Sequence, residues 1–570
     1  MKTLTQLFIV AAMVITPSLC VAEVRLRGPA IIAPDVPALV RVEKREGKRW
    51  RLVDPADYRV DELDGLRVVP DPAGEPMNPL TIVGKTAGEA TLGVYVGGQA
   101  GSLSLTVGQQ LPVGEVRVSV RPRKATHSFD GFGGGVLFYD NQWELSEGDE
   151  IWDWCFQDVQ TDFLHLLIRP AYEKENDNAD WKTLEPGGFD FKKSTRAINV
   201  ATKALEKRPQ MKIYLSLYSP PAWMKQGDTT RGDKGLKPDP QMRLELAEYV
   251  YAYLKRLKYA NITVDYLALF NEPGFPHEQD GMHIKDFGEL TAIFADTSAA
   301  LQELIKQDDT LEMPKLIFAD SLGAGTITRS KTNTPKLLQQ TSLLRRRVDV
   351  WGVHDYWNQK GYWPKRYGEL RNFPAVGNKP IWMTEWAQRD KRGDLASANQ
   401  YAANMLNAIR LGAQAWMVFE WCHPSGNQSG LISCNWGAKP PLKEYWRSKA
   451  YYVFRQIANT LPEDAQVAPS EAQGRGEIRV STGGKNAQVE HMAFVNDDRV
   501  VAHVSNSSQS PVRLQLTWPC KKEPQKWGAL ITGPTANNEK YNGLEMKFRR
   551  RNIEFTGELP ANSLVTVVAE

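Results

Sequence analysis

Two stretches of sequence decide the fold: Ala268-Leu269-Phe270-Asn271-Glu272-Pro273 and Pro380-Ile381-Trp382-Met383-Thr384-Glu385-Trp386. Each is an apolar run that leads into a glutamate. Such a run is typical of a strand that is buried on both faces, as in a parallel sheet. In barrel enzymes the carboxyl ends of the strands carry the reacting groups. The two stretches therefore predict a pair of carboxylates at one mouth of a parallel barrel.

Similar apolar runs recur along the middle of the chain, with helical patterns such as 242–259 and 287–305 between several of them. Eight strand-helix units predict a (β/α)8 TIM barrel, which we place at residues 129–458. Glu272 and Glu385 would then end strands four and seven. They are 385 − 272 = 113 residues apart, or about 38 residues per unit, which suits a barrel with loop insertions. The eight runs are 134–138, 163–168, 213–217, 266–270, 315–319, 348–353, 381–384 and 415–419.

Short alternating segments with Pro and Gly turns flank this region on both sides. Residues 23–111 have the pattern of an immunoglobulin-like β-sandwich. Residues 459–570 predict a second β-sandwich at the side of the barrel. A strand within residues 112–128 joins this side β-domain from the other end of the chain. The predicted fold class is therefore α/β, a TIM barrel with a side β-sandwich and an additional N-terminal β domain.

The N-terminus has the features of a secretory signal peptide over residues 1–22. Lys2 precedes a short apolar stretch, Leu7 to Ile15, and small residues close it at Ala22. The stretch is shorter than the roughly 20 residues that span a bilayer. We therefore expect a secreted or periplasmic protein with no membrane segment in its mature form. Export would permit a disulfide between Cys422 and Cys434, and buried free thiols are the alternative.

The composition is that of a soluble globular protein, with 42% hydrophobic and 24% charged residues and a formal net charge of +3. No long basic tract is present, so nucleic acid is not expected as a partner. We expect a monomer. A glycan is the partner that the carboxylate pair and the aromatic loops predict.

Two carboxylates that face each other in a barrel mouth are suited to glycosidic bond cleavage. One must hold a proton for the leaving oxygen while the other stays ionised. Asn271 is placed to hydrogen-bond a sugar hydroxyl beside Glu272. Arg169, at the end of the second strand, is predicted to lower the pKa of the nucleophile. No metal or organic cofactor is needed for this chemistry.

Three motifs give a resemblance to glycoside hydrolase family 30, of the retaining barrel clan A. They are Gly131-Phe132-Gly133-Gly134, Ser219-Pro220-Pro221-Ala222-Trp223-Met224-Lys225 and Asn271-Glu272-Pro273. The resemblance extends from about Val116 to the C-terminus and includes the side β-domain of the family. It implies that Glu272 is the acid/base and Glu385 the nucleophile. It also implies that His354 and Tyr356 line the site and orient the nucleophile.

Two features depart from the resemblance. The family usually has a tryptophan before its Ser-Pro segment, where this chain has Tyr218 nearby. The N-terminal domain lies outside the resemblance, and its role stays open.

Several tryptophans fall in predicted loops, where an aromatic face suits a sugar ring. Trp421 is the predicted platform under the cleaved sugar, followed by Trp223, and Trp386 lies beside the nucleophile; the other loop tryptophans are Trp181, Trp357, Trp363 and Trp436.

The sequence thus predicts a secreted retaining β-glycoside hydrolase that acts by double displacement. Endo action on a polysaccharide or oligosaccharide of the β-1,6-glucan, β-1,6-galactan or xylan type is favoured by export and by the aromatic loops. An exo-acting β-glycosidase is one alternative. The other is a catalytically inactive protein that binds glycans. The sugar, the linkage and the choice between exo and endo action stay open.

Overall fold

The computed structural model describes most of the chain. The predicted signal peptide lies outside the described residues, as do Trp357 and Trp436. The side chains of residues 334–340 and 363–366, and thus that of Trp363, are also not described. The described residues are 23–70, 77–177, 180–183, 188–322, 334–354, 356, 363–388, 392–424, 429–434, 445–480 and 487–570.

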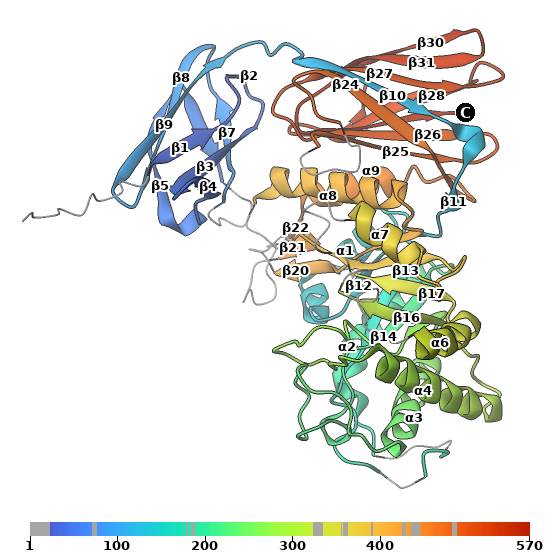
Figure 1. The fold of residues 1–570 in the computed structure, drawn as a ribbon. Coiled ribbons are helices and arrows are strands. Elements are labelled where there is room, and N and C mark those ends of the chain that lie inside the picture. The colour runs from blue at the N-terminus through green and yellow to red at the C-terminus, as the bar shows by residue number, and fades with distance from the viewer. Residues whose placement is uncertain are drawn as a thin grey trace, which may run out of the picture.

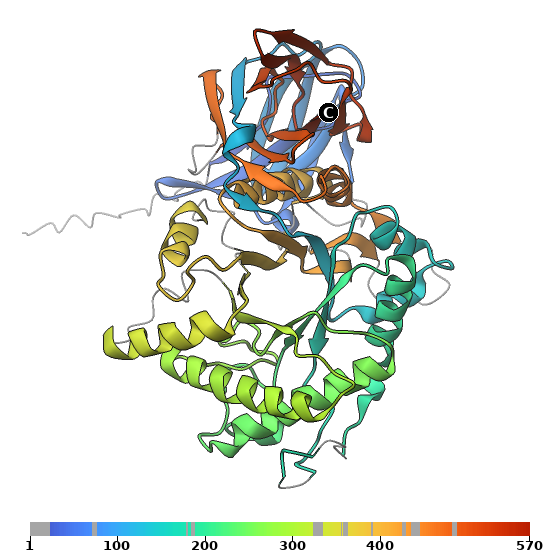
Figure 2. The same ribbon diagram turned by 90° about the vertical axis from the view of Figure 1, so that its right-hand side faces the viewer.

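In this part of the chain eight parallel strands form a closed barrel, which confirms the predicted fold class. The strands are buried along most of their length because side chains fill the inside and helices lie outside (Figure 2). In order around the barrel they are β12 (Gly131–Val136), β13 (Phe163–Ile168), β14 (Lys212–Leu217), β15 (Tyr266–Ala268), β16 (Lys315–Ser321), β17 (Val350–Val353), β18 (Ile381–Trp386) and β19 (Ala415–Val418).

The helices around the barrel follow the predicted periodicity closely. The two helical patterns named from the sequence correspond to α3 (Gln241–Tyr259) and α4 (Phe287–Gln307). Asp286 caps α4 because its side chain accepts a hydrogen bond from the Glu289 backbone N–H at 2.9 Å. The other α-helices are α1 (Glu150–Phe156), α2 (Thr195–Lys207), α6 (Thr334–Arg347), α7 (Trp363–Arg371), α8 (Asp394–Arg410) and α9 (Lys449–Ala458); short 3-10 helices are η1 (Pro55–Asp57), η2 (Pro122–Lys124), η3 (Asp140–Leu145), η4 (Phe191–Ser194) and η5 (Ala222–Met224).

Large side chains fill the N-terminal half of the barrel interior. Trp382 lies there with its ring 4.6 Å from that of Tyr266 and 4.9 Å from that of Phe163. Its indole N–H donates to Asp130 at 2.7 Å, which satisfies the buried nitrogen. The carboxylates at the other end of the strands therefore lie above a closely packed layer of buried side chains.

The N-terminal domain consists of two small sheets that share one core. Figure 1 shows it beside the side β-domain at one end of the molecule. Its contacts with that domain include hydrogen bonds from Leu39 N and the Gln110 side chain to Gln509. Its strands are β1 (Val24–Arg27), β2 (Ile31–Ile32), β3 (Ala38–Glu46), β4 (Arg49–Leu52), β5 (Tyr58–Asp64), β6 (Leu66–Val69), β7 (Leu80–Gly84), β8 (Gly88–Val96) and β9 (Gln99–Val107).

The side β-domain is built from both ends of the catalytic region. Its first sheet has the order β24 (Ser470–Gly476), β10 (Gly114–Val120), β27 (Val512–Pro519), β31 (Asn552–Leu559) and β30 (Leu544–Arg549). The strand that precedes the barrel, β10, thus lies between two strands that follow it. The second sheet contains β11 (His127–Ser128), β23 (Gln466–Ala468), β25 (Val489–Val495), β26 (Val500–Asn506), β32 (Ser563–Ala569), β28 (Trp527–Thr532) and β29 (Asn537–Lys540).

A further small sheet follows the last barrel strand and consists of β20 (Glu420–Pro424), β21 (Gly430–Cys434) and β22 (Tyr445–Arg447). Cys422 and Cys434 lie in it as buried free thiols, which is the alternative to the disulfide.

No helix among the described residues has the length and apolarity needed to cross a bilayer.

Candidate active site

Glu272 and Glu385 meet at the carboxyl ends of their strands. Glu272 follows β15, and Glu385 is the fifth residue of β18. Both are buried, with 5% and 7% of their surface exposed. A carboxylate oxygen of each, together with a ring nitrogen of His354, lies within a group whose atoms are no more than 4.8 Å apart. Such a short separation is typical of retaining glycosidases, whereas inverting enzymes need room for a water molecule between the carboxyls.

The backbone at Glu272 is in the left-handed region, with φ of 49°. Its N–H donates to the carbonyl of Asp320 at 2.8 Å. Asp320 itself has φ of 41°, and the pairing of β16 with β17 shifts register between Phe318 and Ser321. Side chains disfavour this region, so such conformations persist where the surroundings hold them and cluster at active sites. The irregular strand ends bring Glu272 and Asp320 together.

His354, which follows β17, lies between the acidic groups and is fully buried. Its Nδ1 is 3.0 Å from Glu272 Oε1 and 3.6 Å from Glu385 Oε2, and its Nε2 is 3.1 Å from Asp320 Oδ1. Burial alone would lower the pKa of His354, but the charges of Glu385 and Asp320 and hydrogen bonds to Asp320 and Glu272 raise it well above its ordinary value. Contacts with three acidic side chains therefore favour the protonated form of His354.

Asp320 holds the ring of His354 in place through its contact with Nε2. It is fully buried and accepts hydrogen bonds from Tyr214 at 2.5 Å and from Thr384 at 2.6 Å. Burial would raise the pKa of Asp320, but the charge and hydrogen bond of His354 outweigh this and lower it. The barrel interior thus holds an ionised carboxylate whose partners come from three strands, which fixes the ring of His354.

The two glutamates have unequal pKa values in the empty site. Burial raises the pKa of Glu385 to about 7; the negative charges of Glu272 and Asp320 add to this, while His354 and a hydrogen bond from Tyr356 oppose it. Burial would also raise the pKa of Glu272, but hydrogen bonds to His277 and His354 and their charges lower it. Like charges at this separation cannot both ionise freely, so the pair titrates as one unit.

Three other polar residues border the pair. The Tyr356 hydroxyl donates to Glu385 Oε1. His277, from the loop after β15, has Nε2 at 2.9 Å from Glu272 Oε2. Asn271 is 5% exposed, and its buried Oδ1 has no hydrogen-bond partner among the described residues. That acceptor suits a hydroxyl group of a ligand, since a buried polar atom without a partner is costly.

Several solved structures with the same architecture are described as glycoside hydrolases. A family 30 xylanase C catalytic domain from Talaromyces cellulolyticus matches with a TM-score of 0.60 and 18% identity, covering 80% of this chain and 100% of that one. The family 30 subfamily 8 xylanase Xyn30A from Clostridium acetobutylicum matches with 0.59 and 20%, covering 80% and 99%. The endo-β-1,6-glucanase BT3312 matches with 0.55 and 14%, covering 81% and 94%.

The chain has the fold of the family 30 glycosidases. A comparison with protein-family models found no match, and neither did a comparison with curated proteins. The shared architecture therefore rests on the structure. The matches cover 80% of this chain, which is more than the barrel alone occupies, so the similarity extends beyond the barrel.

Arg169 and Trp223 lie near the mouth but outside the group around His354. Arg169 donates to the Leu137 carbonyl and lies 3.8 Å from Asp140. The groups that act most on the pKa of Glu385 are His354, Glu272, Tyr356 and Asp320, so these contacts do not support the predicted effect of Arg169 on the nucleophile. Trp223, in η5, is half-buried and packs toward Glu173.

Trp386 and Trp421 have no exposed face for a sugar. Trp386 is fully buried, with its ring 4.8 Å from that of Tyr401. Trp421 is also fully buried and packs edge-on against Phe454 at 5.5 Å. The platform role predicted for Trp421 is therefore corrected to a core role, because β20 turns the side chain toward α9. A Cβ atom on Gly134 would collide with this ring, so the glycine makes room for it.

Glu272, His354 and Glu385 are close enough to bind one metal ion between them. However, His354 presents both ring nitrogens to carboxylates, and its pKa is raised. A protonated imidazole has no lone pair for a metal. The group is therefore better suited to proton transfer than to metal binding.

Sequence reasoning missed Asp320 and His277. Asp320 directly follows the predicted apolar run 315–319, so it satisfies the same rule that found the two glutamates: a carboxylate at the end of a buried strand. His277 had no comparable signal, since it lies in a loop whose path depends on its contacts. Its place beside Glu272 is known only from the structure.

Proposed function

We propose that the protein is a retaining β-glycoside hydrolase that acts by double displacement. The observation that carries the proposal is the short separation of Glu272 and Glu385 at the barrel mouth. In the first step Glu385 attacks the anomeric carbon, and Glu272 protonates the departing glycosidic oxygen. In the second step Glu272 takes a proton from water, which attacks the same carbon and releases Glu385. The sugar leaves with its anomeric configuration retained.

The proton of the pair must move before the first step. In the empty site the pKa order favours the proton on Glu385, whereas the acid role requires it on Glu272. Glu272 Oε2 faces His277, and Oε1 faces His354. We infer that the glycosidic oxygen displaces His277 from Oε2. Loss of that hydrogen bond raises the pKa of Glu272 and draws the proton to it.

The neighbouring groups have separate roles in this proposal. The cation at His354 keeps the two carboxylates close without full charge repulsion, and Asp320 holds that cation in place. Tyr356 stabilises the ionised form of Glu385 and orients the attacking oxygen. Asn271 binds a sugar hydroxyl next to the cleaved bond. Arg169 and Trp223 lie near the barrel mouth, farther from the two glutamates.

We further propose a β-linked polysaccharide or oligosaccharide as substrate, with endo action. Neighbours of the same fold are described as xylanases and as an endo-β-1,6-glucanase, which supports a β-1,6-glucan, β-1,6-galactan or xylan type. Digestion of defined oligosaccharides reports the linkage and the mode together. Release of single residues from one chain end would indicate the exo-acting alternative.

The mechanism is tested at Glu385. A fluorinated sugar that forms a slow glycosyl ester should label Glu385, and Glu385→Gln should abolish both labelling and turnover. Glu272→Ala should retain cleavage of substrates with good leaving groups and lose it for poor ones. Proton NMR of the first product should show retention. Normal turnover by Glu385→Gln would refute the mechanism, and binding without any release of sugar by the wild type would favour a glycan-binding protein.

Export is proposed from the N-terminal segment alone. Expression of the full chain in a bacterium should yield a mature protein that begins at Glu23 and is found outside the cytoplasm. Mass spectrometry of the secreted or periplasmic fraction measures this. An intact N-terminus in the cytoplasm would contradict it.

A further inference from the structure

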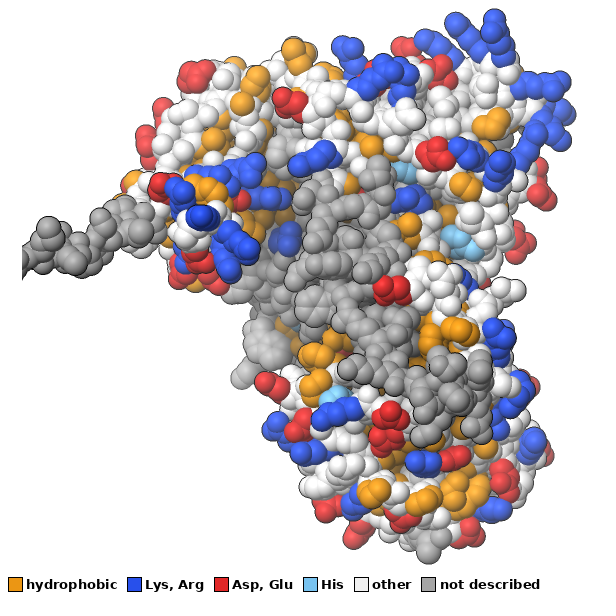
Figure 3. Space-filling model, viewed as in Figure 1, with side chains coloured by type: hydrophobic (Ala, Val, Ile, Leu, Met, Phe, Trp, Pro, Cys, Tyr) orange, Lys and Arg blue, Asp and Glu red, His pale blue; other side chains and the backbone are white. Residues whose placement is uncertain are grey.

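A cluster of cations lies at one end of the side β-domain. We call it the basic tip; it consists of Lys521, Lys522, Arg549, Arg550 and Arg551, all of which are exposed. Among the described residues none of these side chains has an ion-pair or hydrogen-bond partner. Figure 3 shows Lys and Arg side chains gathered at the end of this domain that points away from the N-terminal domain. The whole chain has a net charge of only +3, so the cluster is a local excess.

The backbone at the basic tip is unusual. β30 and β31 form a hairpin in which Arg549 pairs with Asn552. The two loop residues, Arg550 and Arg551, have φ of 50° and 65°. A two-residue hairpin loop with both φ values positive favours Asn-Gly, because larger side chains are disfavoured in this region. Two arginines therefore occupy the positions where they cost the turn most, which points to a role for their side chains.

A neighbouring loop brings further charge to the turn. Pro519 pairs with Asn552, and the Cys520 N–H donates to the Arg551 carbonyl at 2.9 Å. Lys521 and Lys522 follow directly, so five cations from two segments share one end of the sheet. Glu523 is the nearest acidic residue along that loop.

An exposed aromatic ring lies close to the basic tip. Trp527 is 41% exposed, and its ring lies 5.2 Å from that of Phe555. Phe555 is three residues along β31 from Asn552, or roughly 10 Å at the usual rise of a strand. Trp527 thus presents a flat apolar face at the edge of the same domain.

We propose that the basic tip and Trp527 bind an acidic polysaccharide, a β-glycan that bears carboxylate groups. This rests on the proposed glycosidase function and adds a second contact with the polymer, remote from the catalytic glutamates. Guanidinium groups pair with carboxylates in two parallel hydrogen bonds, and an indole face packs on a sugar ring. An anionic membrane is the less favoured occupant, because residues 549–552 at the end of the hairpin contain no apolar side chain and Trp527 packs on Phe555 rather than extending from that turn.

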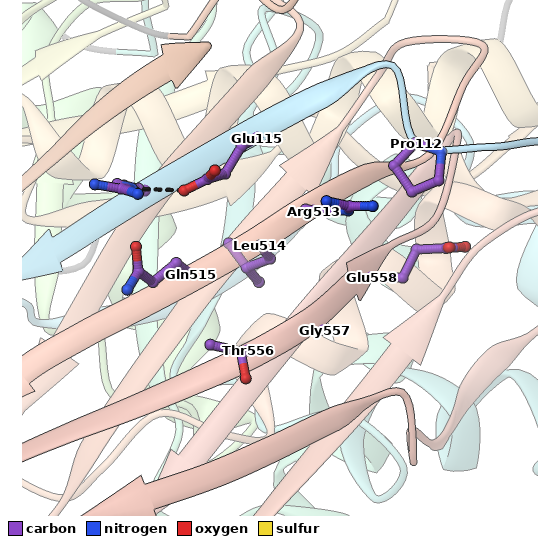
Figure 4. A pocket seen from close by; sticks show the side chains of 9 residues that line it. Pro112, Glu115, Arg513, Leu514, Gln515, Thr556, Gly557 and Glu558 are labelled. Carbon is purple, nitrogen blue, oxygen red and sulfur yellow. Dashed lines mark hydrogen bonds and ion pairs between the residues drawn. The ribbon is translucent and has the colours of Figure 1, made fainter. Parts of the chain in front are cut away.

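The other end of the same sheet provides a comparison. Its outer face has an open hollow of about 490 Å³, lined in part by Glu115, Arg117, Arg513 and Glu558 (Figure 4). Acids and bases balance there, and Arg117 pairs with Glu115 at 2.5 Å. A polyanion gains nothing from this face, so it serves as the control surface.

The test uses the full chain with Glu385→Gln, so that no polymer is cleaved and binding is measured apart from catalysis. The probes are carboxymethyl cellulose and hydroxyethyl cellulose, which have the same β-glucan backbone with and without carboxylates. We expect retardation in affinity electrophoresis by the first probe only, and a loss of affinity as salt is added. Arg550→Asn with Arg551→Gly should weaken that binding about tenfold, and Trp527→Ala should weaken it further.

The Asn-Gly variant separates binding from folding, because this turn sequence should raise the melting temperature while binding falls. Arg117→Gln with Arg513→Gln removes the same charge from the control surface and should leave affinity unchanged. Equal binding by the wild type and the Asn-Gly variant would overturn the proposal. So would equal retardation by both celluloses, or binding to phosphatidylglycerol vesicles or duplex DNA without binding to carboxymethyl cellulose. Each of these results is independent of whether the wild-type barrel hydrolyses glycans.

Discussion

The chemistry of single residues depends here on which groups share a proton. The pKa of His354 is raised because Glu385, Asp320 and Glu272 surround the ring, although its burial opposes this. Burial raises the pKa of Glu385 to about 7, whereas hydrogen bonds to His277 and His354 and their charges lower that of Glu272. These pKa shifts lead to two predictions about the pH dependence of activity.

The first concerns Tyr356→Phe. The pair must hold one proton, which passes from Glu385 to Glu272 when substrate binds. Burial raises the pKa of Glu385 to about 7, so activity should fall as pH rises through this region and the pair loses that proton. The Tyr356 hydrogen bond lowers this pKa. Its removal should therefore shift the alkaline limb of kcat/KM to higher pH, as measured by initial rates across the profile. Tyr541→Phe, which removes a hydroxyl from the side β-domain, should leave the limb in place. An unchanged or lower limb in Tyr356→Phe would contradict the assignment.

The second concerns Asp320→Asn, which keeps the shape of the side chain and removes its charge. The charge of Asp320 raises the pKa of His354, so the variant should lose the His354 proton at lower pH. We expect the alkaline limb of kcat to move to lower pH and kcat to fall on the order of 100-fold as the glutamates lose their alignment. Asp308→Asn removes a carboxylate that also accepts from a tyrosine, Tyr251, and should not change the profile.

At the scale of elements, the ends of strands decide which side chains reach the barrel mouth. β15 and β16 end irregularly, so Glu272 and Asp320 face each other through the backbone hydrogen bond that joins them. β20 instead turns back toward α9 and takes Trp421 into the core. An aromatic residue two positions beyond a strand can thus lie either in the core or at the barrel mouth, and the sequence pattern does not distinguish these two places.

This leads to a prediction about the two tryptophans proposed for the cleft. Trp421→Ala should leave a cavity and destabilise the protein by about 3–5 kcal/mol, with a lower melting temperature and an unchanged KM of the folded enzyme. Trp223→Ala, at a half-buried position, should raise KM for polymeric substrate with a smaller loss of stability. Calorimetry and steady-state kinetics measure both. A raised KM with a normal melting temperature in Trp421→Ala would restore the platform role.

At the scale of the whole molecule, segments that precede and follow the barrel pair with each other in the side β-domain. β10 precedes the barrel and pairs with β24 and β27, which follow it. α8 and α9 pack between the barrel and the side β-domain (Figure 1). Among the described residues, the N-terminal domain contacts this unit through hydrogen bonds to Gln509.

Two truncated chains should test the roles of the N-terminal domain and of β10 separately. A chain that begins at Leu111 retains β10, and we expect it to fold and to hydrolyse short oligosaccharides within about twofold of the mature protein, since the N-terminal domain has a hydrophobic core of its own. A chain that begins at Arg121 lacks the strand between β24 and β27, and its side β-domain should unfold. Circular dichroism melting and initial rates compare the two. Equal stability of both would contradict the role of β10.

The sequence by itself determined the barrel and its two glutamates, because buried parallel strands need long apolar runs and a carboxylate at the end of such a run stands out. It also pointed to Asn271 as the neighbour of Glu272 and, through the family resemblance, to His354 and Tyr356. Only the tertiary structure decided that Asp320 and His277 contact the same group, that Trp386 and Trp421 are core residues and that Arg169 pairs with Asp140. The physical reason is that periodicity reports whether a face is buried, whereas a contact between distant segments depends on where the chain turns.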